Sequence, residues 1–243
     1  MAGTCTSARR GQRKIKTAPA TTNVTSSVSN RRSPIDSVVA TTRGDDGTTG
    51  LLFGGERIGK DDPRAEAYGT IDEAVAALGM ARANLGVKRR IGTLPAGLGG
   101  LATLILRLQR ELFVVGAELA TNPAAWDRLE DGRTRVSEAM VAGVEHDLVE
   151  LERHLEMPRE FVVPGETATS AALELARTIL RRAERRAVAL QREGLIPGPN
   201  LIPYLNRLAD LVWVLARAAE RAESRAATPA RKPGAANRRE TRT

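Results

Sequence analysis

A glycine-rich segment ahead of the first predicted helix has the groups best suited to hold phosphate. Residues 42–64 read TRGDDGTTGLLFGGERIGKDDPR and contain six glycines. Glycine lets the backbone adopt positive φ and approach a ligand closely. Successive N–H groups in such a loop can form an anion-binding concavity, to which Thr48, Thr49 and Lys60 add donors. We interpret the segment as a polyphosphate-binding loop, although many glycine-rich loops are simple turns.

A different phosphate motif overlaps this segment and fails on inspection. Gly54–Lys60 fits the pattern G-x-x-x-x-G-K, but Asp61 follows where a Walker A loop needs Ser or Thr for Mg²⁺. No parallel-sheet pattern surrounds it. The sequence therefore argues against a P-loop NTPase.

A basic cluster lies on the fourth predicted helix. Its arginines are Arg177, Arg181, Arg182, Arg185 and Arg186. Arg177, Arg181 and Arg185 recur every four residues, with Glu184 in the same sector, and repel one another by about 0.2–0.5 kcal/mol per pair. A phosphate chain would satisfy them, because each charge-assisted hydrogen bond contributes about 1.5–3 kcal/mol. The alternatives are a solvated basic face or pairing with acids on another helix.

Two polar pairs lie on other predicted helices. Asn206 and Asp210 share a face one turn apart, either as an interhelical hydrogen-bonding device or as a contact to a purine or ribose. Asp72 and Glu73 lie near the start of the first helix, where acids interact favourably with the helix dipole by about 0.3–1 kcal/mol. Alternatively, Asp72 pairs with an arginine such as Arg177, across a subunit boundary.

Apolar residues at offsets of three and four predict the elements that carry these side chains. The five expected helices span about residues 62–84, 98–120, 135–156, 167–193 and 200–224. Asp62 and Pro63 suit the start of the first helix, and Gly86 is expected to end it. The expected buried sector of the fourth helix is Ala172, Leu175, Ala176, Ile179, Ala183 and Leu190. The expected core residues of the fifth helix are Leu205, Leu208, Val212 and Leu215. With no convincing strand, the fold class is an all-α five-helix bundle.

The net charge of +8 belongs to the ends of the chain. Residues 1–35 carry seven basic and no acidic side chains, and residues 225–243 carry six basic and one acidic. Such tails either contact nucleic acid or anionic surfaces or are solvated and disordered, and their few large apolar residues favour disorder. Nucleic acid is not an expected partner of the intervening, mildly acidic part.

These observations divide the chain into three parts. We expect a disordered basic N-terminal extension (1–38), a helical bundle (39–225) that includes the polyphosphate-binding loop (41–61), and a disordered basic C-terminal tail (226–243). The extension is free of acids up to Asp36 and rich in Arg, Ser and Thr, which is typical of an organellar transit peptide. We expect a cytoplasmic protein, or an organellar matrix protein if the extension is such a peptide.

Several classes of site are excluded by residue content. Cys5 is the only cysteine, which excludes an intramolecular disulfide and a cysteine-based zinc site and fits a reducing compartment. No apolar run is long enough to span a membrane. His146 and His154 lack the Glu-x-x-His spacing of ferritin-like metal bundles. We therefore expect no metal-ligating residues.

Taken together, several segments resemble the PduO-type ATP:cob(I)alamin adenosyltransferases, or corrinoid adenosyltransferases, over about residues 42–224. Besides the glycine-rich segment, the matching motifs are EAYGTIDEAVAALG (66–79), LQRELFVVGAELA (108–120), EFVVPG (160–165), ALELARTILRRAERR (172–186) and YLNRLADLVWVLAR (204–217). The resemblance implies a five-helix bundle with ferritin-like up-down packing that forms a homotrimer with active sites between subunits. It also implies a transferase that moves the 5′-deoxyadenosyl group of ATP to cob(I)alamin, giving adenosylcobalamin and triphosphate.

The resemblance also implies roles for particular residues. Contacts to the ATP phosphates fall on Thr42, Arg43, Gly44, Gly47, Thr48, Thr49 and Lys60. The nucleotide-binding run of the fourth helix is Arg181, Arg182, Glu184 and Arg185, joined by Asn206. Asp72 and Arg177 match a salt bridge across the subunit interface, and Phe161 matches an aromatic residue that occupies the lower face of the corrin and keeps cobalamin base-off. The implied catalytic set is Arg181, Asp72, Arg177 and Phe161.

Some positions depart from the family pattern. The usual TRTGD start reads TTRGD, D-E-L-N becomes Asp72-Glu73-Ala74-Val75, and the P-G-G turn becomes Pro164-Gly165-Glu166. The implied ligands are ATP, Mg²⁺ and cob(I)alamin, and the implied partners are a reductase and an adenosylcobalamin-dependent mutase. The alternative function is a non-catalytic corrinoid carrier, which would keep a corrin pocket yet need no triphosphate loop.

Overall fold

The computed structural model describes residue 37 and residues 39–231 of the chain. The chain divides into two units, Met1–Thr42 and Arg43–Thr243, and every helix and strand of the described residues belongs to the second. Most of the predicted N-terminal extension, including Cys5, lies outside the described residues, as does the end of the C-terminal tail.

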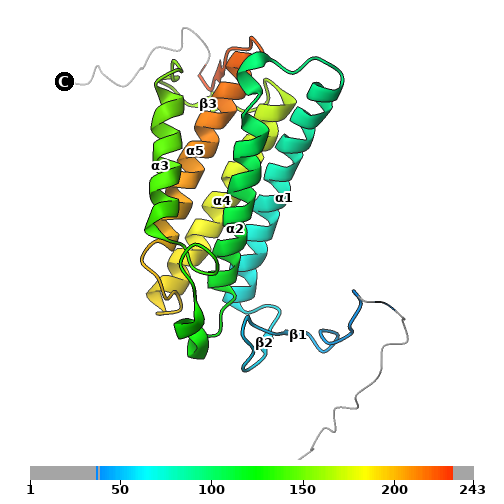
Figure 1. Cartoon of the computed structure of the whole chain (residues 1–243), viewed down its shortest axis with the longest axis vertical. Helices are drawn as coiled ribbons and strands as arrows, with labels where there is room; N and C mark the ends of the chain where they lie inside the picture. Colours follow the sequence, from blue (N-terminus) through cyan, green and yellow to red (C-terminus); the bar gives the residue numbers. More distant parts are fainter. Residues whose placement is uncertain (1–36, 38, 232–243) are drawn as a thin grey trace, which may run out of the picture. The chain divides into compact units, whose positions relative to one another are not determined.

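Five α-helices form the second unit and confirm the predicted all-α bundle. They are α1 (Pro63–Arg90), α2 (Leu101–Leu119), α3 (Glu138–Glu152), α4 (Ala168–Arg192) and α5 (Leu201–Ala222). Each helix runs opposite to the one before it, so the packing is up-down (Figure 1). Two short 3-10 helices, η1 (Ala96–Leu98) and η2 (Pro123–Arg128), lie in the connections. None of the helices in the described part of the chain is long and apolar enough to cross a membrane.

The helices enclose one aliphatic core. α4 packs against α1 and α5, α2 packs against α1, and α3 packs against α5. The expected apolar residues of α5, Leu205, Leu208, Val212 and Leu215, are all fully buried. Burying such a side chain contributes about 1.5–3 kcal/mol. The core therefore holds the polar faces of α4 and α5 in fixed positions.

The first helix begins as predicted but ends later. Asp62 caps it by accepting a hydrogen bond from the Arg64 N–H at 2.8 Å, and Pro63 occupies the first helical position. The prediction that Gly86 ends the helix is wrong, because α1 continues to Arg90. The side chain of Leu85 is buried in the core. Such packing outweighs the cost of about 1 kcal/mol that glycine brings to a helix interior.

The buried sector of α4 also differs from the prediction at one residue. Leu175 is 48% exposed, whereas Leu173 and Leu180 are fully buried. Because α4 packs against both α1 and α5, its buried surface covers two directions rather than one. A single apolar stripe read from the sequence therefore misplaced Leu175.

Two short antiparallel ladders lie at opposite ends of the bundle. β1 (Thr48–Thr49) pairs with β2 (Ile58–Gly59) where α1 begins and α2 ends, and β3 (Val162–Val163) pairs with β4 (Thr228–Pro229) at the other end (Figure 1). β4 falls in the part of the chain that the sequence placed in a disordered tail. Residues 226–231 of that tail have defined structure, and β4 joins the connector between α3 and α4.

Candidate functional site

The glycine-rich segment folds as a tight hairpin. The Gly47 N–H donates to the Gly44 carbonyl at 3.2 Å, and the Lys60 N–H donates to the Gly47 carbonyl at 2.9 Å. Gly47 has a φ of +79°, in the region that favours glycine. The fold therefore requires a glycine at Gly47 for the turn itself. Thr42 belongs to the first unit, where its φ is +55°.

Lys60 lies directly against the backbone of Gly44. A Cβ placed on Gly44 would be 3.0 Å from both the Cε and the Nζ of Lys60. The missing side chain at Gly44 thus makes room for the ammonium group beside backbone atoms of the turn. The sequence predicted that the glycine backbone approaches a phosphate ligand, and that prediction stays a prediction.

Arg57, which the sequence analysis did not single out, connects the two strands of the hairpin. Its Nε donates to the Thr48 hydroxyl at 2.7 Å, and its Nη2 donates to the carbonyls of Arg43 and Thr48 at 2.8 and 3.0 Å. The Thr48 hydroxyl donates in turn to Asp46, and this hydrogen bond is the main reason that the pKa of Asp46 is lowered. The segment's composition contains no signal for these contacts, because they depend on the hairpin register.

The middle of the hairpin is fastened to the end of α2. The Leu52 N–H donates to the Ala120 carbonyl at 2.7 Å, and the Asn122 side-chain amide donates to the Gly54 carbonyl at 2.9 Å. The guanidinium of Arg128 lies 4.2 Å from the centre of the Phe53 ring, a cation–π contact. These contacts hold the hairpin at the end of the bundle where α1 begins.

The arginines of α4 divide into two groups. Arg182 pairs with Glu73 of α1, and Arg186 lies 2.5 Å from Glu66 and also contacts Thr70 of the same helix. These two therefore follow the alternative of pairing with acids on another helix. Arg181 and Arg185 are exposed, and neither forms an ion pair among the residues that the structure describes. Their guanidinium groups remain open to an anionic ligand.

A cleft of about 860 Å³ lies beside α4 and brings three of the predicted residues together. Phe161, Arg177 and Arg181 line it, with contributions from α3, α5 and the chain after β4. The Phe161 side chain is 90% exposed and makes little contact with the rest of the chain. The cleft thus combines an unburied aromatic ring with several guanidinium groups.

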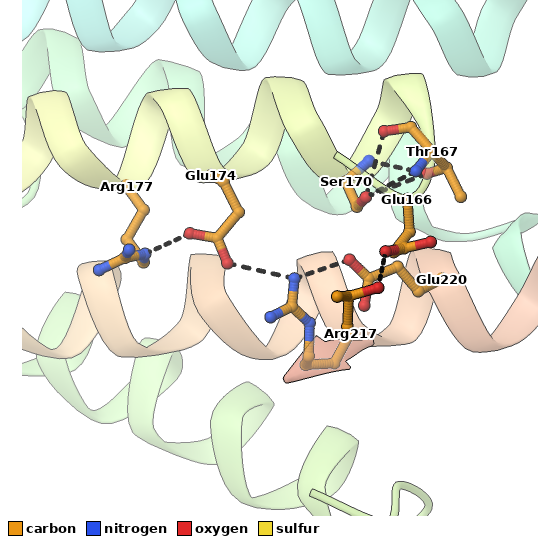
Figure 2. Close-up of polar contacts among 8 residues, drawn as sticks. Glu166, Thr167, Ser170, Glu174, Arg177, Arg217 and Glu220 are labelled. Atoms are coloured by element: carbon orange, nitrogen blue, oxygen red, sulfur yellow. Dashed lines mark hydrogen bonds and ion pairs between the residues drawn. The ribbon is translucent and has the colours of Figure 1, made fainter. Parts of the chain in front are cut away.

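A charged network inside the bundle holds Arg177 at this cleft (Figure 2). The Arg177 Nε donates to Glu174 at 2.6 Å, and Arg217 lies 3.2 Å from the other oxygen of Glu174. Arg217 also donates to Glu220 at 2.7 Å, and burial raises the pKa of Glu220. Arg217, Glu174 and Glu220 are each 3–4% exposed. Removing one partner of such a network typically costs about 3–5 kcal/mol.

Helix periodicity did not predict this network. The one feature of the sequence that could have indicated it is the pair Arg217 and Glu220, three residues apart on the otherwise apolar face of α5. A charged pair within a buried stripe needs a compensating charge on a neighbouring helix. Glu174 of α4 supplies that charge, but helix periodicity does not show which residue of α4 faces Arg217.

Other predicted residues stay apart within one chain. Arg207 and Asp210 form an ion pair at 3.1 Å and line the cleft, whereas the half-buried Asn206 is not among its lining residues. Asp72 is exposed on α1 and has no ion pair in the described part of the chain, while Arg177 is bound to Glu174. The hairpin and the Phe161 connector lie at opposite ends of the bundle.

Within residues 37 and 39–231, no group of three or more His, Cys, Asp or Glu side chains is arranged to hold a metal ion. His146 is exposed on α3. The charged groups that line the cleft are mostly guanidinium groups, and two of its carboxylates, Glu174 and Asp210, are in ion pairs. The arrangement suits binding of an anionic or amphiphilic ligand by charge and shape.

Comparison with known proteins relates this arrangement to a family. Residues 39–219 match the cobalamin adenosyltransferase family. A corrinoid adenosyltransferase from Citrobacter freundii is 38% identical over 183 residues, and the match covers 75% of this chain and 94% of that protein. A corrinoid adenosyltransferase from Bacillus subtilis (strain 168) is 36% identical over 178 residues, covering 73% of this chain and 83% of that protein.

Solved structures agree with these relatives. A variant of a PduO-type ATP:corrinoid adenosyltransferase from Lactobacillus reuteri, complexed with cobalamin and ATP, superposes with a TM-score of 0.66 at 28% identity and covers 79% of this chain and 98% of that chain. A second variant, complexed with ATP, gives a TM-score of 0.67 at 28% identity, covering 79% of this chain and 100% of that chain. Since the family match spans most of the chain and the relatives match along most of their length, the chain belongs to the cobalamin adenosyltransferase family.

Proposed function

We propose that this protein transfers the 5′-deoxyadenosyl group of ATP to the cobalt of cob(I)alamin. The electron pair of Co(I) forms the new bond to C5′ while the bond between C5′ and O5′ breaks. Triphosphate leaves with the electron pair of the broken bond, and adenosylcobalamin remains. The observation that carries the proposal is the cleft in which Phe161 stands beside Arg177 and Arg181. Relatives named corrinoid adenosyltransferases, and a similar structure complexed with cobalamin and ATP, support it.

In this proposal the chain contributes position and electrostatics, because Co(I) is itself the nucleophile. Lys60 and the N–H groups of the hairpin bind the phosphates of ATP, and Arg181 and Arg185 stabilise charge that develops on the leaving triphosphate. Holding C5′ in line with cobalt supplies a large effective concentration. Two observations support these roles: the exposed guanidinium groups of α4, and the position of the Lys60 side chain directly against the Gly44 backbone.

We assign Phe161 to the lower face of the corrin. Its ring is 90% exposed on a connector beside the cleft, which leaves one aromatic face free for a planar macrocycle. An aromatic side chain there would exclude the axial base and water from cobalt. Removal of the axial ligand makes Co(II) easier to reduce to the reactive Co(I).

We further propose a homotrimer in which each active site lies between two subunits. Within one chain the hairpin and the Phe161 connector lie at opposite ends of the bundle, and Arg177 is bound to Glu174 rather than to its predicted partner Asp72. A neighbouring subunit would bring the hairpin and Asp72 of one chain to the cleft of another. The carboxylate of Asp72, which forms no ion pair with any described residue, and the exposed side chains of Met80 and Phe113 support such a contact.

Mg²⁺ is proposed as the ion that accompanies ATP. Mg²⁺ usually binds through substrate phosphates and one or two carboxylates, so a cluster of three protein ligands is not required. Asp45, exposed in the hairpin, and Glu184, half-buried on α4, carry carboxylates near the groups assigned to phosphate. Removal of Mg²⁺ with EDTA should abolish turnover, and excess Mg²⁺ should restore it.

The deciding experiment is an anaerobic assay of the full chain with chemically reduced cobalamin, ATP and Mg²⁺. Adenosylcobalamin and triphosphate should form in equal amounts. A non-catalytic corrinoid carrier would bind cobalamin but release no triphosphate. Formation of adenosylcobalamin without triphosphate, or of neither product, would overturn the proposed reaction.

A further inference from the structure

The connector that carries Phe161 is held by a segment from beyond the end of the bundle. Val162 and Val163 of β3 pair with Pro229 and Thr228 of β4, and the Ala230 N–H donates to the Phe161 carbonyl at 2.7 Å. This ladder spans more than sixty residues of sequence. It joins the chain after α5 to the chain before α4.

A side-chain contact strengthens this attachment. The Thr228 hydroxyl donates to the carboxylate of Glu166, which directly precedes the Thr167 cap of α4 (Figure 2). Gly165 lies between Phe161 and Glu166 and has a φ of +131°, a backbone conformation that residues other than glycine rarely adopt. β4 therefore holds the connector on both sides of this turn.

The exposure of Phe161 makes the backbone attachment decisive. A side chain that is 90% exposed gains little positional restraint from packing. Its place at the cleft then depends on where its backbone is held. Within residues 39–231, the backbone of Phe161, Val162 and Val163 is held by hydrogen bonding to Ala230 and by pairing with β4.

The same segment also forms part of the cleft. Ala230 and Arg231 line it together with Phe161, Arg177 and Arg181. Residues 228–231 thus touch both the element that presents the ring and the space that the ring faces. This segment therefore does more than follow the end of α5, because its residues also line the cleft.

We propose that residues 228–231 are a positioning element for the corrin: β4 holds the connector so that Phe161 meets the lower face of cobalamin, and Arg231 completes the cleft wall. This inference rests on the proposed function, since it assigns the cleft to a corrin. It predicts that, without β4, less of the bound cobalamin is in the base-off state, while ATP binding at the hairpin and α4 is unchanged.

Two truncations test the proposal with a matched control. One protein ends at Ala227 and lacks β4, and the other ends at Arg231 and keeps it. Both lack residues 232–243, so only the positioning element differs. Each is loaded anaerobically with cob(II)alamin and ATP, and the base-off absorption spectrum, the cobalamin Kd and the ATP Kd are measured.

The protein ending at Ala227 should lose most of the base-off signal and bind cobalamin at least about tenfold more weakly, a change of about 1.4 kcal/mol. Its ATP Kd should stay close to that of the protein ending at Arg231, which should match the full chain. An unchanged base-off spectrum without β4 would overturn the proposal. Equal weakening of ATP and cobalamin binding would also overturn it, because that indicates a general loss of structure.

Point variants of the full chain decide the matter if the shorter protein does not fold. Ala230→Pro removes the N–H that donates to Phe161, and Ala230→Ser keeps it. The proline variant should reduce the base-off signal at an unchanged thermal midpoint, and the serine variant should not. Identical spectra for the two variants would contradict the proposal. Turnover by the full chain tests the proposed function separately.

Discussion

At the scale of single residues, the cleft differs from an ordinary basic surface in how its arginines are used. Arg182 and Arg186 are neutralised by acids of α1, and Arg177 is held by the buried carboxylate of Glu174. Arg181 remains exposed at the cleft wall, on the same helix. Because its neighbours are already paired, Arg181 is the guanidinium best placed to bind a ligand oxygen.

Replacement of Arg181 by alanine should impair turnover without unfolding the protein. Loss of a hydrogen bond to a charged group costs about 1.5–3 kcal/mol, so kcat/KM for ATP should fall by about ten- to a hundredfold. Arg153→Ala, which removes an exposed pair with Glu150 on α3, is the matched control and should leave both activity and thermal midpoint nearly unchanged. Normal activity in the Arg181 variant would show that the phosphate assignment is wrong.

At the scale of elements, the hairpin and the C-terminal end of α2 are held by contacts to backbone groups. Lys60 lies where Gly44 leaves space, and Arg57 holds the two strands together. In the last turn of α2, the buried Glu118 accepts a hydrogen bond from the Val136 N–H at 2.7 Å. The first two contacts lie within the hairpin, and the third ties the loop before α3 to α2, so changes there should affect one element at a time.

The hairpin can be tested with two glycines. Gly44→Ala should displace the Lys60 side chain, because the new Cβ would lie 3.0 Å from its Nζ, and should raise the KM for ATP severalfold. Gly50→Ala is the control, since its Cβ would meet only the Arg57 guanidinium at 3.8 Å. Steady-state kinetics at saturating cobalamin distinguish them. Equal effects of the two substitutions would argue against a specific role for the contact between Lys60 and Gly44.

Glu118 should make stability depend on pH in a defined direction. Burial raises the pKa of Glu118 above the ordinary 4.5. At a pH between 4.5 and this raised pKa, the folded chain therefore binds more protons than the unfolded chain. The free energy of unfolding therefore falls as pH rises above about 4.5 through this window. Glu118→Gln should remove that contribution, and its stability relative to the unmodified chain should improve as pH rises from about 4.5 to 7.

Urea unfolding at several pH values measures this effect. The exposed Glu145→Gln on α3 is the control and should follow the unmodified chain across the range. Parallel pH profiles for the Glu118 variant and the unmodified chain would show that the carboxyl group does not titrate differently in the folded state.

At the scale of the whole molecule, we propose that the active site is shared between two chains. The hairpin lies at one end of the bundle and the Phe161 connector at the other. Asp72 is exposed on α1, and Phe113 of α2 and Met80 of α1 are also exposed, at 63% and 58%. Apolar side chains exposed to this degree, together with a free carboxylate, suit a surface that meets another subunit.

Mixing two inactive variants tests the shared site. Asp72→Ala and Arg177→Ala should each lose most activity as separate proteins. In a mixed trimer, some interfaces bring an intact Asp72 from one subunit to an intact Arg177 from its neighbour, so co-expressed variants should recover part of the activity. No recovery in purified mixed trimers would contradict a pair that spans the interface. Light scattering of the unmodified chain measures the oligomeric state directly.

The sequence by itself determined the helices, because apolar spacing depends only on which residues lie on one face. It predicted five helices, the start of α1 at Asp62 and Pro63, and the core residues Leu205 and Leu208. Its motifs also indicated the family, which the comparisons confirmed. Helix positions, the helix start and the family motifs can each be recognised within one short stretch of sequence.

Only the tertiary structure decided which distant residues meet. The Gly86 prediction failed because packing of Leu85 carries α1 onward, and Leu175 was misplaced because α4 has two neighbours. Pairings such as Glu174 with Arg217, and β3 with β4, join segments far apart in the chain. Such contacts depend on how helices are docked and in what register, and no local periodicity specifies either.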